Sequence, residues 1–204
     1  MKLLRSSAMS QPAFEHLSNV MSSIEPLNEE DWEMVLARFN PVSFRKKDRI
    51  LDTEEVSNRY IFIASGLARL YGYKEGEEKT LFFFKEGMFA GSIQSYLFDQ
   101  PSQLVLEAIE DVEGLEIGKE DLDYVFRSSA AISKILMIYT QMRLSSLLNY
   151  FSSFVLDSPE ERYEKFILTE PDLHNRVPQH IIASFLGITP VSLSRIRKRL
   201  FDKR

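Results

Sequence analysis

The spacing of hydrophobic positions changes three times along this chain. Between residues 12 and 40 apolar residues recur at three- and four-residue steps, which predicts two short helices with Pro26 and Pro41 as breaks. From about residue 42 to 118, short β-type runs alternate with turn signals that contain glycine, proline or acidic residues. Many short strands at this spacing predict a sandwich or barrel rather than alternating βαβ units. The clearest runs are 42–44, 49–51, 60–63, 67–73, 79–84, 103–109 and 112–117.

Helical spacing returns after residue 119, and neither glycine nor proline interrupts residues 119–156. We expect a short lead-in helix and then one long helix from near Ala130. Its apolar positions are too broad for one stripe, so the helix must bury one side on its own β domain and another on a further surface. A second copy of the chain is the expected partner, and a helix packed wholly inside one monomer is the alternative. The predicted dimer-helix residues are Ile132, Ile135, Leu136, Tyr139, Met142, Leu147 and Tyr150; Ile138, Leu144, Leu148 and Val155 fall outside this stripe.

The segment Ser158-Pro159-Glu160-Glu161 has the pattern of a helix start, with a capping serine, a proline at the first helical position and acidic residues in the first turn. A boundary near residue 157 follows. We therefore expect an N-terminal helical extension (1–24), a β domain (25–128), a dimerisation helix (129–157) and a C-terminal helical domain (158–204).

Charge separates the last thirty residues from the rest of the chain. The net charge of the 204 residues is −5, yet residues 175–204 hold seven of the 25 lysines and arginines and one acid, Asp202. This segment carries +6 and residues 1–174 carry −11. Such asymmetry predicts that the basic end binds a polyanion; a solvated basic tail is the alternative.

Residues 179–200 fit a helix-turn-helix. Gly187 supplies a turn that requires positive φ, and Ala183 is small enough for a second helix to cross closely. Thr189-Pro190 predicts an N-cap followed by the first helical residue. Apolar residues at 182, 186, 188, 193 and 196 would hold the two helices together. A purely structural helix pair without nucleic-acid contact is the alternative.

If the second helix enters the major groove of DNA, its N-terminal part reads the bases. We expect Val191, Ser194 and Arg195 to reach base edges, with Arg195 as a bidentate reader of guanine. The neighbouring polar and basic residues would contact phosphates. The full predicted DNA-binding set is Thr189, Pro190, Val191, Ser192, Ser194, Arg195, Lys198 and Arg199.

Composition excludes several other chemistries. The chain has 44% hydrophobic residues, enough for a folded core, and no cysteine, which removes disulfides, thiolate metal sites and cysteine nucleophiles. No uninterrupted apolar run is long enough for a membrane helix, and the start lacks a secretory h-region, so we expect a cytoplasmic protein without membrane contact. We predict no metal site at His16, His174 or His180, no cofactor, and no enzymatic activity, because no catalytic motif is present.

The chain from about residue 25 to 200 resembles the Crp/Fnr family of bacterial transcription regulators. The resemblance rests on short matches in order: 60–63 with 66–70, then Phe89-Ala90-Gly91, then Ile182-Ala183, Leu186-Gly187 and 193–196. It implies an α+β fold with an N-terminal cyclic-nucleotide-binding-like jelly roll (double-stranded β-helix), a long dimerisation helix and a C-terminal helix-turn-helix. The sequence leaves no room for the two-stranded wing of many relatives, so we expect a domain without a full wing, with more of its DNA affinity from residues 197–199, Lys203 and Arg204.

The cassette that binds the cyclic phosphate in ligand-binding relatives is degenerate here. Those relatives place a glutamate and an arginine where this sequence has Ser92 and Ser102. Serine is uncharged and too short to replace a guanidinium group, so the resemblance does not extend to cyclic AMP as the effector. The pocket residues that it implies are Phe89, Gly91, Ser92, Ile93, Gln94, Ser102 and Gln103, with Gln94 and Gln103 expected to face solvent.

The sequence thus predicts a homodimeric regulator that binds a pseudo-palindromic site on double-stranded DNA, with an unidentified small-molecule effector. Occupancy of the roll would shift the long helices and re-space the two DNA-binding units. Three alternatives stay open: a constitutive DNA binder with an inert roll, a sensor of a neutral or hydrophobic molecule, and a small-molecule or cyclic-nucleotide sensor whose helix-turn-helix mediates protein contacts.

Overall fold

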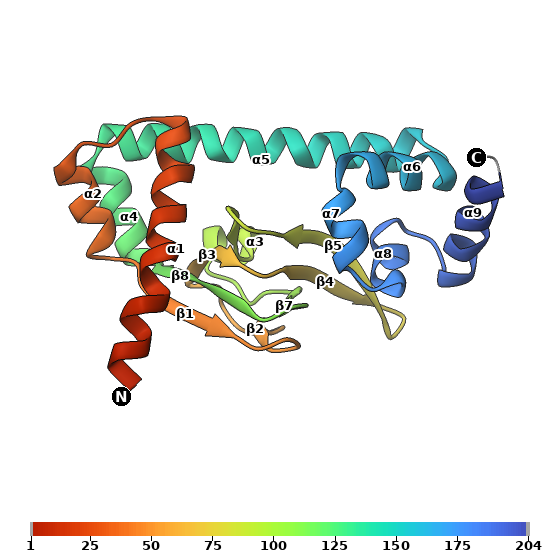
Figure 1. Cartoon of the computed structure of the whole chain (residues 1–204), viewed down its shortest axis with the longest axis horizontal. Coiled ribbons are helices and arrows are strands. Elements are labelled where there is room, and N and C mark those ends of the chain that lie inside the picture. The colour runs from red at the N-terminus through yellow and green to blue at the C-terminus, as the bar shows by residue number, and fades with distance from the viewer. Residues whose placement is uncertain (1, 203–204) are drawn as a thin grey trace. The chain divides into compact units, whose positions relative to one another are not determined.

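The short apolar runs between residues 40 and 118 form two four-stranded sheets (Figure 1). The computed structural model describes the backbone of residues 2–202 and the side chains of residues 11–202. One sheet has the order β1 (Asn40–Phe44), β8 (Val112–Gly118), β3 (Arg59–Ser65) and β6 (Phe89–Ala90). The other has the order β2 (Arg49–Leu51), β7 (Val105–Ala108), β4 (Ala68–Lys74) and β5 (Glu77–Phe84).

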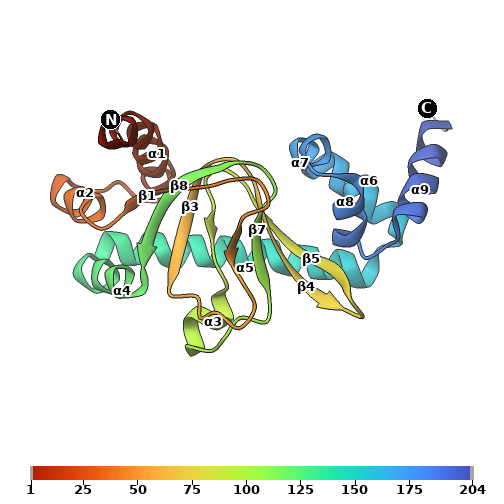
Figure 2. The ribbon, with the colours of Figure 1, turned by 90° about the horizontal axis from the view of Figure 1, so that it is seen from below.

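Strands distant in sequence are neighbours in both sheets, which is the connectivity of a jelly roll. In the first sheet β8 pairs antiparallel with β1, from Asn40 opposite Glu116 to Phe44 opposite Val112, and with β3 on its other side. Figure 2 shows the strands of both sheets from below. The predicted jelly-roll class is confirmed, although its sheet order could not be obtained from the pattern of runs.

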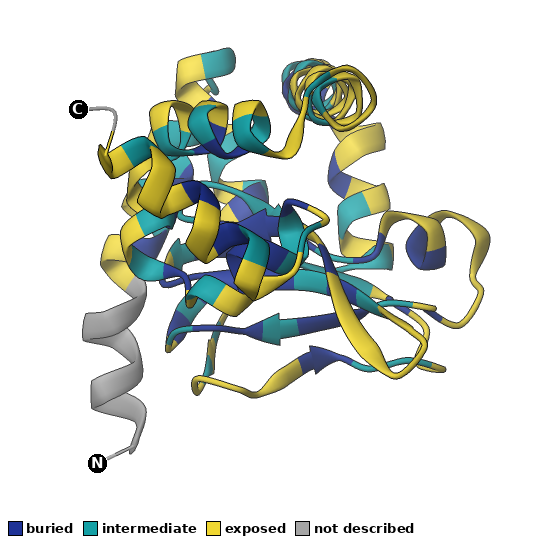
Figure 3. Ribbon diagram, turned by 90° about the vertical axis from the view of Figure 1, so that its right-hand side faces the viewer, coloured by how far each residue is buried: buried dark blue, intermediate teal, exposed yellow. Residues whose placement is uncertain are grey.

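Strand β3 is buried on both of its faces, since Ile61, Phe62 and Ile63 are all buried, and Figure 3 shows buried segments along the strands. Phe62, Leu106 and Leu115 are fully buried. Within the second sheet Arg69 on β4 is also buried, and its Nε and Nη2 donate to Oε1 of Glu107 on β7 at 3.1 and 2.9 Å. This pair keeps a charged group satisfied between apolar neighbours.

The N-terminal segment forms α1 (Lys2–Ile24) and α2 (Glu29–Leu36). The prediction of two helices is correct, but the first begins ten residues earlier than its apolar spacing indicated and contains Pro12. Asn28 caps α2 by accepting a hydrogen bond from the amide of Asp31 at 2.8 Å. Leu17, Met21 and other apolar residues of these helices pack with Phe62 and Leu115 in one core.

Three elements were not predicted from the sequence: β6, the short helix α3 (Ile93–Phe98) and the short helix α7 (Pro171–Arg176). The lead-in helix is α4 (Lys119–Ser128), and the long helix is α5 (Ala130–Leu156), which starts at the predicted residue. None of the helices within residues 2–202 is both long enough and apolar enough to cross a membrane.

The C-terminal part contains α6 (Pro159–Thr169), α7 (Pro171–Arg176), α8 (Gln179–Phe185) and α9 (Pro190–Asp202). The predicted start of α6 is confirmed as a full capping box. Ser158 Oγ accepts from the amide of Glu161 at 3.3 Å, and the Glu161 carboxylate accepts from the amide of Ser158 at 2.8 Å. Lys203 and Arg204, to which the sequence assigned phosphate contacts, lie outside the described residues.

The chain divides into two compact units. One comprises the chain up to Leu70 together with Phe83–Gln141, and the other comprises Tyr71–Phe82 together with Met142 onward. The outer part of the β4–β5 hairpin thus belongs by its packing to the same unit as α6–α9.

Candidate DNA-reading surface and roll cavity

Helices α8 and α9 are joined by a turn that Gly187 makes possible. Its φ is +68°, in the left-handed region that favours glycine. The amide of Gly187 donates to the carbonyl of Ser184 at 3.1 Å, and the amide of Ile188 donates to the carbonyl of Ala183 at 3.0 Å. These two bonds form a Schellman motif, which ends α8 and directs the chain into the next helix.

The second helix begins as the sequence predicts. Thr189 is its N-cap, because Thr189 Oγ1 accepts from the amide of Ser192 at 3.1 Å, and Pro190 is the first helical residue. Ala183 is fully buried where the two helices meet, and Leu193 and Ile196 of α9 are buried with it. The local requirements for a helix-turn-helix are all met.

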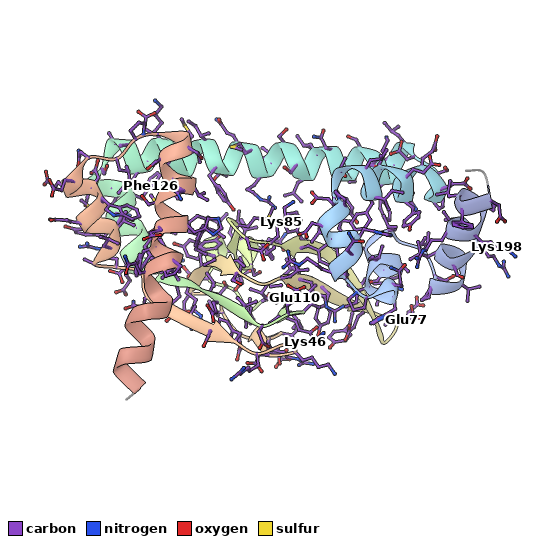
Figure 4. The ribbon with its side chains drawn as sticks, in the orientation of Figure 1. Lys46, Glu77, Lys85, Glu110, Phe126 and Lys198 are labelled. Atoms are coloured by element: carbon purple, nitrogen blue, oxygen red, sulfur yellow. The ribbon has the colours of Figure 1, made fainter. Side chains whose placement is uncertain are left out.

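The predicted DNA-binding residues lie on the exposed side of α9 and its N-terminus, except that Ser192 is half-buried. Arg195 and Lys198 are exposed and form no ion pair with any described residue, and Figure 4 shows Lys198 projecting away from the ribbon. Arg199 differs, because its Nη2 lies 2.8 Å from Oε2 of Glu160 on α6. Arg199 therefore ties the two helices together, a role that the sequence did not predict.

The C-terminal end of α8 is held by two side chains that sequence reasoning did not assign to it. Tyr150 on α5 donates from its hydroxyl to the carbonyl of Phe185 at 2.6 Å and stacks on that ring at 4.8 Å. Burial raises the pKa of Tyr150 to about 12, so the hydroxyl stays a donor at neutral pH. Arg162 on α6 donates from Nε to the carbonyl of Leu186 at 3.1 Å. No local pattern could have revealed contacts between residues so far apart.

The predicted dimer-helix residues have different surroundings. Ile132 and Ile135 are buried in the core of their own chain, with Leu136 packed against that core. The hydroxyl of Tyr139 accepts from the amide of Phe89 at 2.9 Å. Together with the Tyr150 contact, these positions place most of the predicted stripe inside the monomer, and only Met142 and Leu147 of that set are exposed.

A second stripe of α5 is exposed. Its apolar members are Met137, Leu144, Leu148, Phe151 and Val155, and Gln141 occupies the remaining position. The steps between these residues alternate between four and three, which is the heptad spacing of a coiled-coil seam. The sequence placed Leu144, Leu148 and Val155 outside the dimer stripe, and in the structure of the single chain these three residues are exposed.

The roll contains a cavity of about 230 Å³. Its lining is mixed: apolar side chains come from β2, β3 and β7, and polar groups come from the segment before β3 and from Arg59. Arg59 is itself paired, with its Nη1 2.8 Å from Oε2 of Glu116. The lining residues are Ile50, Leu51, Glu55, Val56, Ser57, Asn58, Arg59, Ile61, Ala90, Gly91 and Leu106.

Of the seven predicted pocket residues, only Gly91 lines this cavity. Ser92 and Ser102 are buried next to each other, with their hydroxyl oxygens 3.2 Å apart. Phe89 packs against the core, whereas Ile93, Gln94 and Gln103 are exposed. Gly91 has a packing requirement of its own, because a Cβ there would lie 2.7 Å from Cδ1 of Tyr60.

The histidines have ordinary surroundings. His16 Nδ1 lies 3.2 Å from the carbonyl oxygen of Ala64, His174 Nε2 lies 3.0 Å from the hydroxyl of Tyr163, and His180 is exposed.

Comparison with known proteins agrees with this architecture. Residues 41–129 match the family model of the cyclic nucleotide-binding domain. A search of curated proteins gave no significant match.

Solved structures with the same fold cover most of the chain. FixK2 from Bradyrhizobium japonicum has a TM-score of 0.70 at 18% identity, covering 81% of this chain and 85% of that one. The c-di-GMP responsive global regulator CLP of Xanthomonas campestris has a TM-score of 0.69 at 18% identity, covering 86% and 93%. A protein from Eubacterium rectale described as a transcriptional regulator of the Crp/Fnr family has a TM-score of 0.66 at 18% identity, covering 87% and 85%. The resemblance predicted from the sequence is confirmed, and this chain has the fold of the Crp/Fnr-type transcriptional regulators, with a cyclic-nucleotide-binding-type domain at residues 41–129.

Proposed function

We propose that this chain is a DNA-binding transcriptional regulator of the Crp/Fnr type, without enzymatic activity, that binds a pseudo-palindromic operator as a homodimer. The observation that carries the proposal is the helix-turn-helix itself. Its turn, cap and buried contacts are complete, and apart from Pro190, Val191 and Phe201 the exposed side of α9 presents polar and charged side chains, most of them basic. This is the surface that a recognition helix needs in the major groove.

The roles of the α9 side chains follow from their exposure. Val191, Ser194 and Arg195 are free to reach base edges, with Arg195 suited to a bidentate contact to guanine. Lys198 and the N-terminal hydroxyls of Thr189 and Ser192 would contact phosphates. Arg199 would contact DNA only by exchanging its partner Glu160 for a phosphate, so we expect it to contribute less than Lys198.

Dimerisation through α5 is supported by its exposed heptad stripe. Side chains such as Leu148 and Phe151 lie on one exposed strip of a 27-residue helix, and a soluble protein rarely leaves such a strip uncovered. A parallel pairing of two α5 helices would bury the strip. It would also bring two recognition helices into one assembly, as a two-fold operator requires.

We propose that the effector, if the cavity has one, is a small molecule other than cyclic AMP. A bound cyclic phosphate requires a cation or several aimed donors. The cassette instead offers the neutral, mutually bonded Ser92 and Ser102, and Arg59 in the cavity is engaged by Glu116. An effector acts by binding the two states of the dimer with different affinity, and an inert roll would leave a constitutive binder.

DNA binding is tested by selecting duplexes from a random library and measuring anisotropy against salt. We expect the wild type to retain a two-fold symmetric sequence. Arg195→Ala should weaken binding by about fivefold to a hundredfold and relax one base position. Lys198→Ala should weaken binding to all sequences and lower the salt slope by about one.

The matched control is Lys134→Ala, which removes a lysine on α5 that pairs with Glu25, outside α6–α9. This change should leave the affinity for DNA and its dependence on salt unchanged. Failure of the wild type to retain any specific duplex at low salt would refute the proposal and favour a protein-contact role for the helix-turn-helix.

The dimer is tested by sedimentation of two variants, each of which replaces a side chain that is equally exposed in the single chain. Leu148 is 56% exposed and on the stripe, and Met142 is 57% exposed and off it. Leu148→Glu should give monomers, whereas Met142→Glu should stay dimeric, because only the first places charge in the seam. If the two variants have the same oligomeric state, the stripe through Leu148 is not the dimer interface.

The effector is tested by titration calorimetry with cyclic AMP and cyclic GMP. We expect no binding tighter than roughly millimolar, and micromolar affinity would contradict the proposed loss of the phosphate site.

A further inference from the structure

The cavity of the roll is lined from both sheets and belongs to one compact unit. Strand β3 contributes Arg59 and Ile61, which are two residues apart and so point to the same face of the strand. Tyr60 and Phe62 point to the opposite face, where they pack with the core that includes residues of α1. All the lining residues fall within the chain up to Leu70 or within Phe83–Gln141, so the cavity is formed by that unit alone.

The inner wall of the cavity is apolar. Ile50 and Leu51 on β2 are buried there, and Ile61 on β3 and Leu106 on β7 are each only 1% exposed. The cavity volume of about 230 Å³ lies below the roughly 300–1,000 Å³ of pockets that hold drug-sized ligands. A ligand seated there must therefore be small and must cover an aliphatic surface.

The outer wall carries the polar groups, and backbone hydrogen bonds hold it in place. The amide of Ser102 donates to the carbonyl of Glu55 at 2.8 Å, and the amide of Ser57 donates to Oγ of Ser95 at 2.8 Å. The carboxylate of Glu55 is itself fixed, because its Oε2 accepts from the amide of Asp52 at 2.9 Å. A wall fixed in this way adds little ordering cost when a ligand binds.

The charges at this wall do not balance. Among the described residues that line the cavity, Glu55 and Arg59 are the charged ones. Arg59 Nη1 lies 2.8 Å from Oε2 of Glu116, which is opposite Ile61 in the β3–β8 ladder and so shares its face. Glu55 forms no ion pair with any lysine or arginine that the structure describes. Two carboxylates thus accompany one guanidinium, and one negative charge is left without a cation.

This arrangement separates ligands by their charge. An anion would have to displace Glu116 from Arg59, and the carboxylate of Glu55 would repel it. A neutral molecule would leave the charge of Glu55 uncompensated. An ammonium group donates charge-assisted hydrogen bonds to that carboxylate and supplies the missing positive charge, while its organic body covers the apolar wall.

We infer that the roll cavity binds a small organic ammonium compound, with its nitrogen at Glu55 and its apolar body against Ile61 and Leu106. This inference deepens the proposed effector site and rests on that proposal for its consequence in regulation, but the binding itself is measured without DNA. Glu55 is the residue that determines specificity, and it lies outside the cassette of residues 89–103.

The ligand class is tested by titration calorimetry of the full-length protein with phenethylamine, phenethyl alcohol and phenylacetate. These three probes share one apolar body and differ in charge. We expect phenethylamine to bind about three- to tenfold more tightly than the alcohol, a modest factor for a charge-assisted bond because Glu55 is exposed. Phenylacetate should show no detectable binding. Equal affinity for the amine and the alcohol, tighter binding of phenylacetate, or no binding of the amine would overturn the inference.

The position of the ammonium group is tested with two neighbouring carboxylates. Glu55→Gln keeps an acceptor for the amide of Asp52 but removes the charge, so the amine and the alcohol should bind equally. The matched control is Glu54→Gln, which removes an exposed carboxylate that does not line the cavity, and the preference for the amine should persist. A preference that survives Glu55→Gln, or that both variants lose equally, would contradict the assignment to Glu55.

The location of the apolar body is tested by filling the cavity. Ala90 on β6 lines the cavity and is only 1% exposed, so Ala90→Leu places a larger side chain in the space of the ligand. Phenethylamine and phenethyl alcohol should both lose at least about tenfold in affinity. Unchanged binding in a folded Ala90→Leu protein would place the probes elsewhere and overturn the inference. If this variant fails to fold, the comparison of Glu55→Gln with Glu54→Gln decides the matter.

The outcomes distinguish this inference from the proposed function. A wild type that prefers the amine but retains no DNA duplex refutes the DNA-binding function and leaves the ligand class standing. A wild type that retains a specific duplex but does not discriminate among the three probes refutes the ligand class alone.

Discussion

Replacing Gly187 with alanine separates two requirements at the helix turn. The first is conformational, because the residue has a φ of +68°. The second is steric, because a Cβ there would lie 2.7 Å from Cε2 and Cζ of Phe154 on α5. The first comes from the Schellman motif that ends α8, and the second from the contact of the turn with the long helix.

The two costs can be assigned separate magnitudes. A left-handed backbone costs a residue with a Cβ about 1–2 kcal/mol. The clash adds about 1–3 kcal/mol, with the lower half expected because Phe154 is 45% exposed and its ring has room to move. Gly187→Ala should therefore destabilise the C-terminal unit by about 2–4 kcal/mol. In a Phe154→Ala background the same change should cost only about 1–2 kcal/mol.

The loss of stability caused by Gly187→Ala is measured by urea unfolding, followed with two probes. Far-UV circular dichroism reports all helices, whereas Trp32, the only tryptophan of the chain, lies on α2 in the other compact unit. We expect Gly187→Ala to lower the free energy of unfolding in the dichroism transition and to change the fluorescence transition little. Equal costs in both backgrounds would refute the steric part, and a cost under about 0.5 kcal/mol would refute the left-handed turn.

Three further changes test other contacts. Arg69→Met should leave the partly buried Glu107 carboxylate without its arginine partner, costing about 2–3 kcal/mol in the Trp32 transition. The double change Arg69→Met with Glu107→Leu should recover most of this loss, and no recovery would contradict the pairing. Ser158→Ala should cost about 1 kcal/mol by dichroism through loss of the α6 cap, and a neutral result would contradict the capping box. Hydrogen bonds from a lysine and a serine hold the pKa of Asp157 below its ordinary value of 3.8. The stability that the ionised Asp157 contributes is therefore present above pH 3.8 and is lost as the pH falls through the lowered pKa. Asp157→Asn should therefore show a smaller loss of stability between pH 4 and 2 in an acid titration, and an unchanged acid response would refute this role.

Features with local causes could be predicted from the sequence. The turn at Gly187, the cap at Thr189 and the start of α6 at Pro159 each depend on residues within one helical turn. The strand runs were also recognisable, because alternation and turn signals lie within a few neighbouring residues. Two-residue β6 was missed because it is too short to show any alternation.

Features that depend on distant partners could not be predicted. The two apolar stripes of α5 were visible in the sequence, but periodicity does not say which stripe the monomer covers. The structure buries Ile132 and Ile135 and exposes the stripe through Leu148. Ser184 bonds to a strand 104 residues away, and nothing adjacent in sequence marks that serine as a docking residue.

The edge position of β5 has a consequence for the behaviour of the chain outside its native state. Residues 80–84 read Thr-Leu-Phe-Phe-Phe, an uncharged aromatic run with high β-propensity. Lys79 and Lys85 flank it as charged gatekeepers, and Figure 4 labels Lys85. Ser184 covers its edge at Glu78 and Thr80. When α8 detaches, that edge becomes a template for pairing between molecules. Loss of helices α6–α9 would then reduce solubility, so the same serine protects the chain against aggregation.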